Sequence, residues 1–145
     1  MKNSSLRALA QPHKAAGLAY GVLGVLVIVI TFTAELIPPT REGAYGQLAV
    51  GAVFVLIFAV LLYRQGWWLL SALLVVPNVW RATNYFHHGL GLHVDPLALS
   101  ITTVSPRPAA FVNAALMTIV VSLLVRSAWI GFSAWRTQRR IGEEQ

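Results

Sequence analysis

The chain has 145 residues, of which 57% are hydrophobic and 11% are charged. A soluble domain has about 25% charged residues, so this single-domain chain lacks the charged surface of a soluble fold. It contains no cysteine, which excludes disulfides, thiolate metal sites and cysteine nucleophiles. Its net charge is +6, but the basic residues flank apolar segments, so we attribute the charge to orientation in a bilayer and exclude nucleic acid as a partner.

The first apolar segment runs over residues 15–37, after a short, polar and basic start. A signal-peptide core has about 7–15 residues, so this longer run predicts an uncleaved transmembrane helix. Pro38 and Pro39 should end it, since proline lacks the backbone N–H. Gly17 and Gly21 have the GxxxG spacing that lets another helix approach closely. The alternative is that these glycines have no special role, because glycine is common in membrane helices.

The next two apolar segments, residues 44–63 and 67–86, predict the second and third transmembrane helices. Only Arg64, Gln65 and Gly66 separate them, so we expect these two spans to be antiparallel neighbours. Pro77 lies inside the third span and should kink it.

After Phe86, about twenty residues lie outside the predicted hydrocarbon layer. Asp95 and Pro96 form a favourable helix start, so residues 97–103 are predicted to form a short interfacial helix in this outer loop. The fourth span covers residues 108–130, and the tail, residues 131–145, is expected to extend that helix out of the bilayer.

Four spans place both termini and the Arg64 turn on one side of the membrane. Most basic residues lie on that side, and the loops of membrane proteins that carry most Lys and Arg face the cytoplasm, so both termini are predicted to be cytoplasmic and the outer loop to face the periplasm or the exterior. The basic residues of the cytoplasmic side are Lys2, Arg7, Lys14, Arg64, Arg126, Arg136, Arg139 and Arg140, and those of the other side are Arg41, Arg81 and Arg107.

Polar side chains form a stripe along the third span. Asn78, Arg81, Tyr85 and His88 share one helix face by their spacing, and Asn84 lies beside them. Lipid cannot satisfy such groups, so the stripe should face protein or water and form a polar pocket near the outer side.

We predict that Arg81 forms an ion pair with Glu35, the only acidic residue inside a predicted span. Asn78 and Asn84 would be hydrogen-bond partners of that pair. The alternative is that Arg81 extends outward to the headgroups and Glu35 contacts water.

Histidines near the outer end of the third span raise the question of a metal site. His87, His88, His93 and Asp95 have suitable ligand atoms, but their spacing does not place them on one helix face. We therefore predict neither a metal site nor a cofactor, and expect ordinary hydrogen bonds. The chain also carries no nucleophile-elbow, HExxH or phosphate-loop motif, so no catalytic residue is predicted.

The sequence therefore predicts an all-α integral membrane protein of one domain, residues 1–145, in a bacterial inner membrane. Its fold would be an antiparallel bundle of four transmembrane helices. The expected function is non-catalytic: an accessory or scaffold subunit for a membrane-protein partner, or a binder of a lipid or quinone-like molecule at the outer polar pocket. The alternative is a small transporter or channel protomer that acts as a homo-oligomer and uses Glu35, Arg81 and His88.

Overall fold

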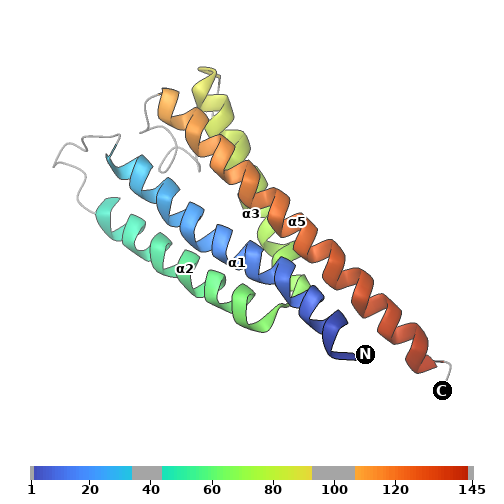
Figure 1. Cartoon of the computed structure of the whole chain (residues 1–145). Helices are drawn as coiled ribbons and strands as arrows, with labels where there is room; N and C mark the ends of the chain where they lie inside the picture. The colour runs from blue at the N-terminus through green and yellow to red at the C-terminus, as the bar shows by residue number, and fades with distance from the viewer. Residues whose placement is uncertain (1, 34–43, 93–106, 144–145) are drawn as a thin grey trace.

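The computed structural model describes residues 2–33, 44–92 and 107–143, which form four α-helices and no β-strand. Consecutive helices run in opposite directions (Figure 1). The start of the first helix, the turn between the second and third, and the end of the last therefore share one end of the molecule, which we call the termini end. The opposite end is called the Gly89 end. The helices are α1 (Lys2–Thr33), α2 (Ala44–Gln65), α3 (Trp68–Gly89) and α5 (Arg107–Glu143).

The four helices are arranged as an open row. α2 packs on α1, α1 packs on α5, and α5 packs on α3, whereas α1 touches α3 only slightly. The prediction that the second and third spans are neighbours is wrong for packing, because α2 and α3 make no substantial contact with each other. The short turn at Gly66, whose φ is +62°, reverses the chain, but each helix lies against a different partner.

Glycines bring α1 and α2 together. A Cβ atom on Gly17 would lie 2.8 Å from the backbone nitrogen of Tyr63 and 2.9 Å from the carbonyl oxygen of Ala59. A Cβ on Gly21 would lie 3.0 Å from the Cβ of Ala59, and one on Gly24 would lie 2.8 Å from Val55. The GxxxG spacing therefore serves close helix packing within the chain, and the alternative that it has no role is wrong.

Glycine also permits close packing of α3 on α5. At the Gly89 end, a Cβ on Gly89 would lie 2.9 Å from the ring of Phe111, which also packs edge-on against Phe86. At the termini end, a Cβ on Gly131 would collide with Trp68. These two close approaches at opposite ends hold α3 along the length of α5.

The interior of the row combines small side chains with large ones such as Leu62, Tyr85 and Met117, and many other large apolar side chains point outward. Alanines at four core positions allow the helices to approach, namely Ala16, Ala59, Ala110 and Ala114.

Two helices are long and apolar enough to cross a membrane, with apolar stretches at residues 12–30 of α1 and 107–141 of α5. Only 33% of each apolar stretch is buried, unlike the core helix of a soluble protein.

The helix ends differ from the predicted span ends. α1 begins at Lys2 rather than Ala15 and continues through Pro12, while α5 continues to Glu143, as expected for the tail. Hydropathy marks where an apolar stretch ends, but polar helix formers such as those in residues 2–11 extend a helix beyond it. α3 is also a single unbroken helix despite Pro77. The predicted interfacial helix, residues 97–103, lies outside the described residues.

Candidate functional site

The polar stripe of α3 points toward other helices, as its spacing predicts. Asn78 is 2% exposed and Tyr85 is fully buried, while Asn84 is also buried and Arg81 and His88 are half-buried. Each asparagine donates a hydrogen bond to the carbonyl four residues earlier: Asn78 Nδ2 to Leu74 at 2.7 Å, and Asn84 Nδ2 to Trp80 at 2.8 Å. These local bonds fix both amides on the helix surface and so define a polar face toward α1 and α5.

Neighbouring helices add polar groups that were not predicted from the sequence. The hydroxyl of Tyr20 on α1 is close enough to interact with the side chain of Asn78 and with the charge of Arg81. Asn113 on α5 is fully buried, two residues beyond the Phe111 that contacts Gly89. Tyr20 of α1 therefore adds a polar group to the polar face of α3, and Asn113 gives α5 a buried polar side chain of its own. Each is a single polar residue in an apolar segment, so the sequence pattern did not identify it.

Arg81 has an unused donor inside this site. Its Nε atom is buried and has no hydrogen-bond partner among the described residues. A buried donor left without an acceptor costs about 1–3 kcal/mol. Glu35, the predicted partner, lies outside the described residues, so the ion pair stays a prediction. An acceptor supplied by a ligand would satisfy the Nε–H.

The histidines do not form a metal centre in the part of the chain that the structure describes. His87 and His88 are half-buried in the last turn of α3, and His93 and Asp95 lie outside the described residues. No group of three side chains suitable for a metal ion occurs among the described residues.

A second buried polar cluster lies at the termini end, and sequence reasoning missed it. His13 of α1 is 7% exposed, and its Nδ1 is hydrogen-bonded to the hydroxyl of Ser127 on α5. Ser127 is also bonded to the hydroxyl of Ser71 on α3, with 2.9 Å between the two oxygens. This serine–histidine cluster therefore ties three helices together by side-chain hydrogen bonds.

Glycines make room for the imidazole of His13. A Cβ on Gly66 would lie 3.2 Å from the ring carbon Cδ2, and one on Gly131 would lie 3.3 Å from Cε1 and Nε2. The sequence offered only a weak signal for this cluster, because His13 lies in the segment interpreted as the polar start of the chain. The extension of the helix to Lys2 places it inside the fold.

A serine bonded to a histidine is also the pair found in enzymes that use serine as a nucleophile and histidine as its base. The serine–histidine cluster shares only the residue types with such a pair. Both serines are fully buried among the helices. A buried, hydrogen-bonded hydroxyl pair instead stabilises the packing of the helices that carry it. The two polar clusters are separated on α3 by the buried side chain of Leu74, which lies midway between Ser71 and Asn78 on the same helix face.

Comparison with known proteins finds no relative of this chain: no family model, no curated protein and no solved structure matches it.

Proposed function

We propose that the chain is an integral membrane protein with four transmembrane helices and with both termini in the cytoplasm. The support is the amount of apolar surface on all four helices, because monomeric soluble proteins rarely expose apolar patches larger than a few hundred Å². Exposed large side chains include Leu18, Val22 and Leu26 of α1, Val53, Phe54, Leu56 and Ile57 of α2, Leu69, Leu73 and Val76 of α3, and Val112, Ile119 and Val125 of α5.

Helix lengths agree with this proposal. α2 and α3 each have 22 residues. At a rise of 1.5 Å per residue each is about 33 Å long, enough for the ~30 Å hydrocarbon layer. α3 has no stretch apolar enough to cross a membrane by composition alone, and the apolar stretch of α2 is the shorter one at Ala49–Gln65. The polar side chains Asn78, Asn84 and Tyr85 of α3 are buried, however, while Leu73 and Val76 are exposed. Lipid would therefore contact the apolar face of α3.

We infer that the function of this membrane protein is the non-catalytic binding of an amphiphilic molecule, lipid or quinone-like, at the Arg81 site. The observation that carries the inference is the buried Nε–H of Arg81 without a partner among the described residues. A carbonyl or ester oxygen on a largely apolar body would supply the missing acceptor. An accessory subunit that presents such a molecule to a membrane-protein partner would also need this binding site.

Transport is less well supported than binding. Polar groups in membrane spans mark the paths of transported ions, and the apolar side chain of Leu74 interrupts the polar face of α3, so the described part of α3 carries no continuous polar row. The test is whether the purified chain moves solute or protons into liposomes. If it does, and if Glu35→Gln abolishes the movement, the transport proposal would replace the binding proposal.

Ligand-induced stabilisation tests the binding proposal. The purified chain in mild detergent is heated with a panel of short-chain quinones and zwitterionic lipids, since a ligand at 100 times its Kd adds about 2.7 kcal/mol to folded-state stability. We expect at least one member to raise the unfolding temperature of the wild type and of Arg126→Met, whose arginine is exposed on α5, but not that of Arg81→Met. Equal stabilisation of both variants, or none in the wild type, would contradict the proposal.

A further inference from the structure

A hollow at the termini end combines positive charge with aromatic walls. It has a volume of about 410 Å³ and lies where α1, the α2–α3 turn and α5 meet. Lys14 and Arg64 supply the charge, and both are exposed. Tyr63, Trp68 and Trp135 supply the aromatic surface. We call this feature the basic hollow, and the described residues that line it include no acidic side chain.

Cation–π contacts occur in the basic hollow at Lys14 and beside it at Arg139, which is not one of its lining residues. The Nζ atom of Lys14 lies 5.7 Å from the centroid of the Tyr63 ring. The Arg139 guanidinium stacks at 4.7 Å on the ring of Trp135, which packs in turn against Trp68 at 5.8 Å between ring centroids. The cation–π contact of Lys14 leaves its N–H donors available to an anion in the hollow.

An apolar trough continues from the basic hollow along the seam between α1 and α2. The two features share Tyr63 and Arg64, and the trough has a volume of about 760 Å³. Gly17 and Gly21 form part of its lining, together with exposed apolar side chains that include Leu18, Val22, Leu56 and Val60. A ligand that filled both features would have an anionic head and a long apolar chain.

We propose that the basic hollow and this trough bind one anionic glycerophospholipid of the cytoplasmic leaflet. The phosphate would lie between Lys14 and Arg64, and an acyl chain would lie along Gly17, Leu18 and Val22. The proposal rests on the membrane arrangement proposed above, but it concerns the end of the molecule opposite to the Arg81 site. Free phosphate shares the headgroup chemistry, but it would leave the trough empty.

Binding to the purified full-length chain in mild detergent tests the site. Native mass spectrometry compares phosphatidylglycerol with phosphatidylcholine of the same acyl chains. Near a membrane surface each Lys or Arg contributes about 1 kcal/mol, or a roughly fivefold factor, in affinity for anionic lipid, so Lys14→Gln with Arg64→Gln should weaken phosphatidylglycerol binding about 30-fold. Phosphatidylcholine binding should change little.

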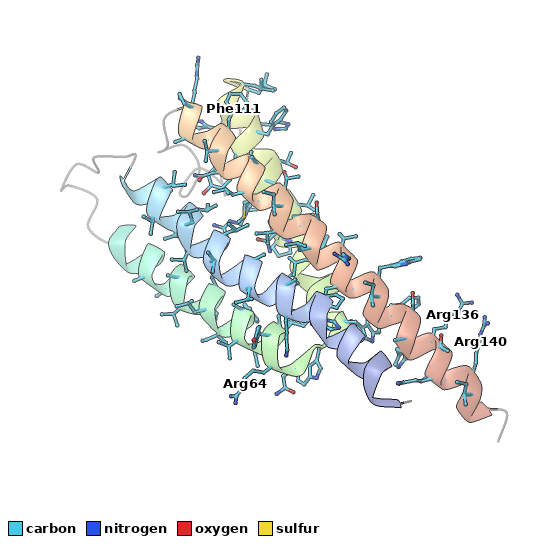
Figure 2. All side chains as sticks on the ribbon, in the orientation of Figure 1. Arg64, Phe111, Arg136 and Arg140 are labelled. Atoms are coloured by element: carbon cyan, nitrogen blue, oxygen red, sulfur yellow. The ribbon has the colours of Figure 1, made fainter. Side chains whose placement is uncertain are left out.

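A matched control separates the hollow from general attraction to positive charge. Arg136→Gln with Arg140→Gln removes the same charge at the same end, and Figure 2 shows these two arginines on the flank of α5 away from Arg64. The control should bind phosphatidylglycerol as the wild type does. Equal weakening of both double variants, or none in the first, would overturn the proposal.

Further arms distinguish a lipid from a free anion and confirm that the variants fold. Inorganic phosphate and glycerol 3-phosphate should not displace phosphatidylglycerol at equal concentration, and displacement by them would overturn the lipid assignment. Leu18→Trp fills the trough without changing charge and should weaken the binding of long-chain lipid. The charge-conserving pair Lys14→Arg with Arg64→Lys should retain binding, and loss there would also count against the site.

The experiments distinguish a failure of the Arg81 binding proposal from a failure of the lipid site at the basic hollow. Arg81→Met should bind phosphatidylglycerol normally, because Arg81 lies on α3 beyond Leu74 from the termini end. Loss of lipid binding in Lys14→Gln with Arg64→Gln should in turn leave stabilisation by a ligand of the Arg81 site unchanged.

Discussion

Replacement of Gly17 by alanine tests the close contact between α1 and α2. The new Cβ would lie 2.8 Å and 2.9 Å from backbone atoms of Tyr63 and Ala59, and 3.1 Å from the Cα of Tyr63. Carbon atoms prefer separations of about 3.5–4.0 Å, so the helices would have to separate by roughly half an ångström or more. Backbone atoms cannot rotate away as a flexible side chain can. Overpacking of this kind costs about 1–3 kcal/mol.

Gly51→Ala is the matched control, because a Cβ at Gly51 on α2 would meet no atom within 4 Å. Both substitutions gain the higher helix propensity of alanine, which is worth about 1 kcal/mol in water. The difference between the two variants therefore isolates the clash, and we expect Gly17→Ala to be less stable than Gly51→Ala by about 1–3 kcal/mol. The free energy of unfolding is measured by reversible titration with sodium dodecyl sulfate in mixed micelles. Equal stability of the two variants would refute the proposed seam.

Three further substitutions test the other contacts. Ser127→Ala removes the partner of both His13 and Ser71 and should destabilise the fold by about 1–3 kcal/mol, whereas the exposed Ser122→Ala should change stability by less than about 0.5 kcal/mol in the same titration. Gly131→Ala places a Cβ against Trp68 and should destabilise the α3–α5 contact, with altered near-ultraviolet circular dichroism of the tryptophans as the readout. Arg81→Met removes a buried donor that has no partner among the described residues and should raise stability by about 1 kcal/mol without ligand. A loss of that size would show that Arg81 is already paired, as the predicted ion pair with Glu35 requires.

Hydropathy predicted the helices well because it depends on each segment alone. Residues 44–63 correspond closely to α2, and the all-helical class is confirmed for the described residues. Packing order could not be predicted in this way. The short turn before Trp67 shows that α2 and α3 are antiparallel, but which helix each contacts depends on where small residues allow a close approach. The absence of a side chain at Gly17 allows α2 to approach α1 closely, and the same absence at Gly131 allows α3 to approach α5.

The part of the candidate site that lies on one helix could be predicted from the sequence, and the parts on other helices could not. The spacing of Asn78 and Tyr85 on one helix identified a buried face, because helical periodicity fixes which residues share a side. Polar groups on other helices are single residues in apolar surroundings, and no periodicity marks them. The positions of Tyr20 and Ser127 in polar clusters were therefore recognised only from the structure. The ion pair of Glu35 with Arg81 stays a prediction.

The central claim of this account is that the chain crosses the membrane four times. The absence of natural cysteine allows one cysteine at a time to be introduced, and Gln65→Cys at the termini end and Leu92→Cys near the Gly89 end replace exposed side chains. In intact spheroplasts, a membrane-impermeant maleimide should label Leu92→Cys at once and Gln65→Cys only after the membrane is permeabilised. Labelling of both positions from the same side, or recovery of the chain in the soluble fraction, would contradict the claim.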